Sequence, residues 1–172
     1  MERVDLRIQK TRMALKNALY ELLCEMSLDA VTVTNLCQRA VIRKATFYMH
    51  FRDKEELLVY VIQDMRKTYQ DQERGELLYD PEKPTKYYIE IFEYLLEYIE
   101  KHEKFARSVL NSNSCSKVMD MVADIIAEKT GNKMYAVMYT GAIVNLIKWW
   151  ITQPKRMDRD AMTQEILKIL QR

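Results

Sequence analysis

Glycine and proline are scarce in this chain, which contains only three of each among its 172 residues. Both residues interrupt helices, whereas Leu, Ile, Met, Glu and Lys, which are plentiful here, favour them. Apolar residues also recur at helical spacing, as in the stripe formed by Leu15, Ala18, Leu19, Leu22, Leu23 and Met26. We therefore predict an all-α protein, folded either as one compact domain or as a small domain joined to a larger one.

About nine helices are expected from the apolar stripes and from the polar or proline-containing breaks between them. They span about residues 6–26, 33–40, 43–50, 53–73, 85–101, 103–110, 115–129, 133–152 and 159–170. The first three form a candidate helix-turn-helix domain at residues 1–52. The fourth helix would link this domain to a second one at residues 74–172.

Polar side chains predict where several of these helices begin. Thr32 can accept a hydrogen bond from a backbone N–H group of the second helix. Asp53 is followed three residues later by Glu56, which resembles a capping box at the start of the fourth helix. Either Ser114 or Ser116 can cap the helix that ends near residue 129.

Several classes of protein are not expected from the composition. The three cysteines are widely spaced, and no CxxC pair occurs, which favours reduced thiols in an intracellular protein over a disulfide framework. The first residues are charged and lack the apolar region of a signal peptide. The most apolar stretch, residues 136–151, is too short to span a membrane and is interrupted by Asn145 and Lys148. We therefore expect a cytoplasmic protein with no membrane contact.

Enzymatic chemistry has little support in the sequence. Only two histidines are present, and there is no glycine-rich phosphate loop, metal-ligand spacing or paired nucleophile and base. Carboxylate pairs such as Glu55 and Glu56 fit solvated helix faces. No catalytic residue, metal or cofactor is predicted.

The charge of the chain is divided unevenly. Residues 1–54 hold ten Lys and Arg against six Asp and Glu, whereas residues 55–172 hold 17 against 19. The N-terminal third is therefore the part expected to meet a polyanion.

Residues 43–54 carry the most specific functional signal. Arg43 and Lys44 begin a short helix, where the positive end of the helix dipole disfavours cations unless an external anion is present. Phe47 and Phe51 are four residues apart and should face the core. The remaining surface would carry groups that can donate to phosphate oxygens or face a groove, namely Thr46, Tyr48, Met49 and His50, with Lys54 beside them.

The segments Thr32–Ala40, Thr46–Phe51 and Asp53–Leu57 together resemble the N-terminal DNA-binding domain of TetR-family transcriptional regulators. The resemblance covers about residues 7–65. It implies a three-helix DNA-binding domain on a helical ligand-binding and dimerisation domain. It assigns Thr46 and Met49 to the groove-facing surface. The full set of expected DNA-binding residues is Thr32, Thr34, Arg43, Lys44, Thr46, Tyr48, Met49, His50 and Lys54.

Two residues depart from the family pattern in the turn between the second and third helices. Val41 stands where a glycine is common, so a turn that needs a positive φ would be strained or differently shaped. Arg43 stands where a serine usually caps the third helix, so a cap is lost and a cation is gained.

The helix at 133–152 is apolar on nearly all sides and must be covered on all of them. Intramolecular packing could cover it. The resemblance implies instead that it and the last helix form a four-helix bundle with a second subunit. The expected interface residues are Tyr139, Ile143, Leu146, Trp150, Ile166 and Ile169.

Met and Tyr residues of the second domain can line an adaptable effector pocket, although ordinary helical core is the more common role for any one of them. The candidate pocket residues are Tyr94, Tyr98, Phe105 and Met121. The expected function is a ligand-responsive repressor that binds a palindromic operator in double-stranded DNA as a homodimer. The alternative is an interaction module or coactivator of the same fold in which the altered turn has changed or abolished DNA reading.

Overall fold

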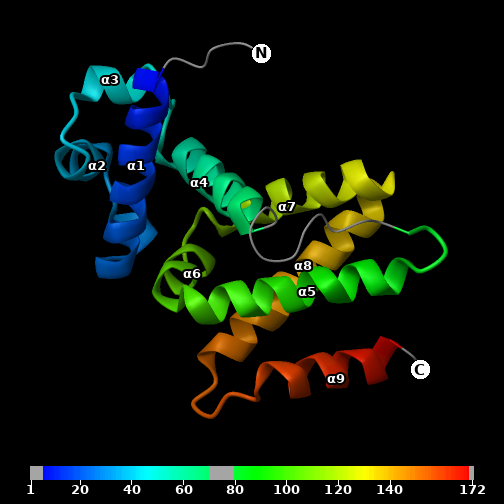
Figure 1. The fold of residues 1–172 in the computed structure, drawn as a ribbon. Coiled ribbons are helices and arrows are strands. Elements are labelled where there is room, and N and C mark those ends of the chain that lie inside the picture. Colours follow the sequence, from blue (N-terminus) through cyan, green and yellow to red (C-terminus); the bar gives the residue numbers. More distant parts are fainter. Residues whose placement is uncertain (1–5, 70–79, 171–172) are drawn as a thin grey trace.

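A computed structural model describes residues 6–69 and 80–170 of the chain. These residues form nine α-helices and one 3₁₀ helix, and no strand occurs among them, which confirms the predicted all-α fold (Figure 1). The α-helices are α1 (Leu6–Glu25), α2 (Val33–Arg39), α3 (Lys44–Tyr48), α4 (Lys54–Tyr69), α5 (Pro84–Lys101), α6 (Glu103–Leu110), α7 (Cys115–Thr130), α8 (Lys133–Thr152) and α9 (Arg159–Leu170).

Most predicted helix bounds agree with the structure to within a residue. The main difference is α3, which is shorter at both ends than the predicted helix at 43–50. A 3₁₀ helix at Leu28–Ala30 was not predicted. The last residues of the helix expected at 53–73 lie outside the described part of the chain.

The first three helices and the start of α4 enclose one apolar core. Leu15, Leu36, Phe47 and Leu57 are fully buried in it. Full burial of a side chain of this size contributes about 1.5–3 kcal/mol. The same cluster includes Phe105 of α6, so the core of this N-terminal head continues into the rest of the molecule.

The C-terminal body has a second core, built from α5, α7, α8 and α9. Phe92, Leu96, Ile147 and Trp150 lie at its centre. In Figure 1, α9 runs beside α5, and α8 crosses behind α5 to pack against α7. None of the helices in the described ranges is long and apolar enough to cross a membrane.

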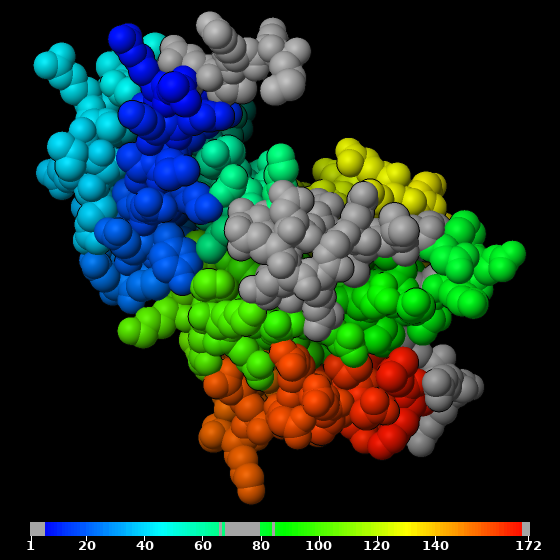
Figure 2. Space-filling model, viewed as in Figure 1, coloured from blue at the N-terminus to red at the C-terminus, as the bar shows by residue number. Residues whose placement is uncertain are grey.

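Polar contacts join the head to the body. The Tyr20 hydroxyl of α1 lies 2.8 Å from Nδ1 of His102, between α5 and α6. The Ser108 hydroxyl donates to the Met26 carbonyl at 3.1 Å, just beyond the end of α1. Figure 2 shows the result, with the blue and cyan head projecting to one side of the green and orange body. Helices α2 and α3 of the head are therefore placed away from α8 and α9.

Candidate nucleic-acid interface and effector groove

The second helix begins with a reciprocal cap. The Thr32 hydroxyl oxygen accepts from the Asn35 N–H at 3.2 Å, and Asn35 Oδ1 accepts from the Thr32 N–H at 3.1 Å. The predicted cap at Thr32 is therefore confirmed. The Thr32 hydroxyl also donates to Asn35 Oδ1 at 2.6 Å, so its proton is already used within the helix start.

The turn after α2 has the hydrogen bonds of a Schellman motif. The Ile42 N–H donates to the Cys37 carbonyl at 3.0 Å, and the Val41 N–H donates to the Gln38 carbonyl at 3.3 Å. This motif places its central residue in the left-handed region, and Val41 has φ 55°. The predicted strain is confirmed, because a β-branched residue at positive φ is a genuine outlier. The Val41 side chain is 89% exposed, so packing does not offset that strain.

The third helix is oriented by its aromatic residues. Phe47 is fully buried and Phe51 is 4% exposed, so both belong to the core as predicted. Their ring centroids lie 6.1 Å apart, and the ring of Tyr60 on α4 lies 5.4 Å from Phe51. The Arg12 guanidinium of α1 covers the Tyr60 ring at 5.5 Å. Helices α1 and α4 therefore hold α3 in place from behind.

Most of the expected DNA-binding residues lie on α2 and α3 or next to these helices. Thr34, Arg43, Lys44, Tyr48 and Met49 are exposed, whereas Thr46 and His50 are half-buried. Arg43 has an extended backbone at the N-cap position, and its side chain makes no capping hydrogen bond. In the part of the chain that the structure describes, no ion pair holds Arg43 or Lys44. These seven expected residues are thus at least partly accessible to solvent.

Lys54 has partners that were not predicted. Its ammonium donates to the carbonyls of Leu28 and Val31, each at 2.8 Å, and to that of Asp29 at 3.3 Å. These three bonds use all the donors of the side chain. Lys54 therefore ties the start of α4 to the 3₁₀ helix, and a phosphate contact would require it to give up one of these carbonyls.

The cap of α4 is close to the predicted capping box. Asp53 Oδ1 accepts from the Glu56 N–H at 2.7 Å, while the Glu56 carboxylate reaches back to the Arg52 N–H at 2.6 Å. Burial acts to raise the pKa of the Asp53 carboxyl, but the hydrogen bonds from Glu56 and Arg52 outweigh it and the net pKa is lowered. Asp53 is thus held as a carboxylate beside Arg52.

Three of the four candidate pocket residues lie in a packed aromatic cluster between the head and the body. Phe105 is 3% exposed, and its ring stacks on Tyr20 with centroids 5.5 Å apart. The Tyr98 hydroxyl donates to Sδ of Met65 at 2.8 Å, and burial raises the pKa of Tyr98. The Tyr94 ring lies 6.3 Å from that of Tyr98. These three residues contribute to packing and do not line the groove described next.

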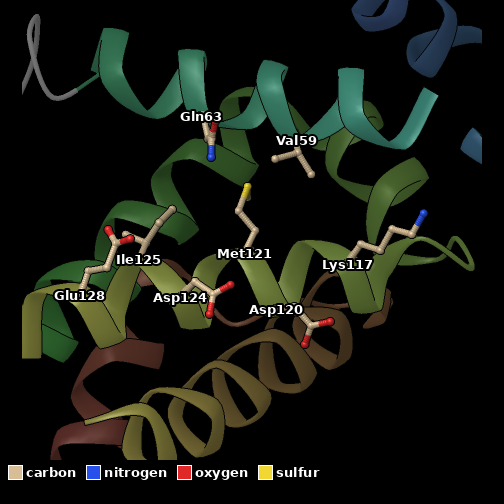
Figure 3. Close-up of a pocket in the computed structure, with 8 residues that line it drawn as sticks. All are labelled: Val59, Gln63, Lys117, Asp120, Met121, Asp124, Ile125 and Glu128. Atoms are coloured by element: carbon tan, nitrogen blue, oxygen red, sulfur yellow. The ribbon is translucent and has the colours of Figure 1, made fainter. Parts of the chain in front are cut away.

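A groove with a volume of about 470 Å³ lies between α4 and α7 (Figure 3). Met121 is the one candidate pocket residue that lines it, and its side chain points from α7 toward α4. The other lining residues are Val59, Gln63, Lys117, Asp120, Asp124, Ile125 and Glu128. Apart from Met121, no local sequence pattern marks this groove, because it lies between two helices that are distant in sequence.

The candidate interface residues on α8 divide between the core and the surface. Ile143 and Trp150 are buried within their own subunit, and Trp150 Nε1 donates to the Met157 carbonyl at 2.7 Å. The expectation that these two side chains face a partner is therefore corrected. Tyr139, Leu146 and Ile166 are partly buried, and Ile169 is 69% exposed.

Another face of α8 is apolar and open. Met134, Met138 and Trp149 are 80%, 61% and 52% exposed, and Ala142 and Asn145 lie exposed between them. Their spacing of three and four residues places them in one stripe along the helix. This stripe is an apolar surface that α8 leaves exposed.

Comparisons with known proteins agree with this geometry. Residues 17–61 match the family of bacterial regulatory proteins called tetR, and residues 86–172, about half of the chain, match a transcriptional regulator C-terminal region. The chain belongs to the TetR family of transcriptional regulators.

One curated relative is YxbF, an uncharacterized HTH-type transcriptional regulator of Bacillus subtilis (strain 168). It is 38% identical over 63 residues, which cover 36% of this chain and 17% of that protein. The match therefore spans less than a fifth of YxbF.

Similar solved structures cover almost the whole chain. Lin0861 from Listeria innocua has a TM-score of 0.73 and 19% identity over 99% of this chain and 94% of its own. NalD of Pseudomonas aeruginosa, the secondary repressor of the MexAB-OprM multidrug efflux pump, has a TM-score of 0.62 and 14% identity over 95% of each chain. DhaS, a dihydroxyacetone kinase operon activator, has a TM-score of 0.57 and 16% identity over 94% of each chain. At these identities the likeness establishes the fold.

Proposed function

We propose that this regulator is a homodimeric, ligand-responsive repressor that acts in the cytoplasm and binds a palindromic operator through α3. The observation that carries the proposal is the exposure of Arg43 at the N-cap of α3 and of Lys44 and Tyr48, which are one helical turn apart on a helix that buried Phe47 fixes from behind. A recognition helix needs both a rigid support and free cationic and hydroxyl groups for phosphates and base edges.

The open stripe of α8 supports the dimer. Met134, Met138 and Trp149 expose apolar area that a second copy of the stripe can cover, as a two-fold interface is self-complementary. A two-fold dimer presents two α3 helices to DNA, and a palindromic operator mirrors that symmetry.

The test is binding to DNA selected from random sequence, followed by titration at increasing salt. We expect affinity to fall steeply with salt, because each neutralised phosphate releases condensed counterions. Lys44→Ala should weaken binding about tenfold and reduce the slope by about one counterion, and Tyr48→Phe should weaken it less. Lys104→Ala, an exposed lysine on α6, is the matched control and should change neither quantity. Equal binding by Lys44→Ala and the unmodified protein would refute the α3 site.

The alternative is a coactivator of the same fold, and the activator DhaS shows that similar folds serve activation. In this chain, the coactivator alternative is supported by Val41, which stands where a glycine is common. The turn nevertheless has both Schellman hydrogen bonds, which supports a regular connection between α2 and α3 and therefore favours DNA reading. A reporter driven by the selected operator separates the two, since a repressor lowers expression and a coactivator raises it or requires another regulator.

A further inference from the structure

The groove between α4 and α7 has an apolar floor. Val59 points from α4 toward α7, and Met121 and Ile125 point from α7 toward α4 (Figure 3). All three side chains are half-buried. The unbranched thioether of Met121 can adapt its shape to an inserted chain. The floor therefore fits the aliphatic part of a ligand, and a volume of about 470 Å³ is that of a small-molecule site.

The rim of the groove is polar and predominantly negative. Asp120, Asp124 and Glu128 follow one another at intervals of four residues along α7, and Lys117 is the one cation among the lining residues. At 1.5 Å per residue the three carboxylates span about 12 Å. Like charges four residues apart on a helix repel, so a bound cation would relieve an unfavourable feature of the unliganded protein.

The distribution of charge along the groove further restricts the ligand. Lys117 lies at one end and Glu128 at the other (Figure 3). Asp124 is already paired with Lys133, which leaves Asp120 and Glu128 as the carboxylates without an ion pair among the described residues. Gln63 points from α4 toward α7 and can accept a hydrogen bond through its amide oxygen.

We propose that this groove binds an organic cation with an aliphatic chain, of which a primary alkylamine is the simplest example. The ammonium group lies at the end of the groove lined by Glu128 and Gln63, and the chain covers Ile125, Met121 and Val59. A carboxylate-bearing ligand of the same length is repelled by the rim. A neutral alcohol retains the apolar contacts but lacks the charge attraction.

The groove also has a position suited to regulation. Its upper wall is α4, whose first residue, Lys54, is bonded to the head. A ligand between α4 and α7 can bind more tightly to one spacing of these helices than to another. It then favours the conformations with that spacing, and α4 moves together with the head. This regulatory step rests on the proposed function, whereas binding of the amine does not.

The experiment uses the full chain labelled with ¹³C at its methionine methyl groups, titrated with octylamine, octanol or octanoate, with the Met121 signal assigned by Met121→Leu. We expect octylamine to shift the Met121 signal in a saturable manner, with octanol at least about tenfold weaker and octanoate weaker still. Glu128→Gln should weaken octylamine binding about threefold to tenfold, and Asp120→Asn, about 12 Å farther along α7, should weaken it less. Glu165→Gln, an exposed carboxylate on α9, is the matched control and should leave it unchanged.

Equal affinity for the amine and the alcohol, or no effect of either groove variant, would overturn the proposed ligand class. Saturating octylamine should change affinity for the selected DNA at least threefold, and unchanged affinity would overturn the regulatory step. Failure to bind any DNA would refute the proposed function instead, because the methyl titration reports on the groove without DNA.

Discussion

Val41 is the residue at which sequence and backbone conformation conflict most directly. It occupies the left-handed position of the turn after α2 with φ 55°, and no side-chain packing compensates for it. A left-handed conformation costs a non-glycine residue about 1–2 kcal/mol, and a β-branched residue is among the least tolerant. The α2–α3 turn therefore holds strain at the edge of the proposed DNA surface.

Replacing Val41 by glycine should stabilise the protein. Glycine removes the steric strain but loses about 0.5–1 kcal/mol through its greater freedom in the unfolded chain. The expected net gain is about 1 kcal/mol, measured by urea unfolding. Ala45→Gly, at an exposed helical position two residues into α3, is the control and should lose about 1 kcal/mol. A loss of stability in Val41→Gly would show that the left-handed conformation is wrongly assigned.

Lys54 and Lys44 should separate folding from DNA binding. Lys54→Ala removes three hydrogen bonds to backbone carbonyls and should lower the free energy of unfolding by about 2 kcal/mol. Lys44→Ala removes an exposed side chain and should change stability by less than about 0.5 kcal/mol. If Lys54→Ala were fully stable and only weakened DNA binding, Lys54 would be a phosphate ligand and not a tether.

At the scale of the element, helix ends could be predicted well because their signals are local. Thr32 caps α2 as expected, and Gly131 ends α7 with φ +69°. Ser114 stands at the N-cap of α7, but its hydroxyl donates to Glu55 of α4 at 3.2 Å and does not cap the helix. That choice depends on a residue 59 positions away, which no local pattern contains.

The inward face of α8 could not be predicted for a related reason. A helix that is apolar on all sides has no periodic contrast, so its sequence does not distinguish core from interface. Ile143 and Trp150 face the core, whereas Met138 and Trp149 face outward. The same limit applies to Phe105, whose ring is buried against α1 of the other domain.

The open stripe of α8 should determine the oligomeric state. Met138→Glu places a charge at the centre of the proposed interface, where burial without a partner is costly, and should convert the dimer to a folded monomer. Light scattering coupled to size exclusion measures the mass, and circular dichroism checks the helix content. Met157→Glu, at a half-exposed methionine in the segment between α8 and α9, is the control and should remain dimeric. A Met138→Glu protein that stays dimeric would place the interface elsewhere.

At the scale of the whole molecule, the orientation of the head depends on how firmly it is attached to the body. Phe105 of α6 shares a core with α1 and α4, and Tyr20 reaches His102 at 2.8 Å. Lys16 and Asp64 form a 2.5 Å ion pair between α1 and α4. Apolar burial supplies most of this attachment, whereas the directional hydrogen bonds select one orientation of the head. A ligand bound between α4 and α7 would have to overcome these contacts to change the orientation of the head.

The Tyr20 hydroxyl tests whether the orientation of the head matters for function. Tyr20→Phe keeps the ring on Phe105 and removes the bond to His102, so stability should fall by about 0.5–1.5 kcal/mol. Tyr20 lies far along α1 from the α3 surface, so it should not contact DNA itself. If DNA affinity falls by more than the loss of folded protein explains, the orientation of the head has changed. Tyr135→Phe, on the exposed part of α8, should alter neither quantity. If Tyr20→Phe lowered stability with DNA affinity intact, the hydrogen bond would only hold the domains together, and the orientation of the head would be set by apolar packing between α1 and α6.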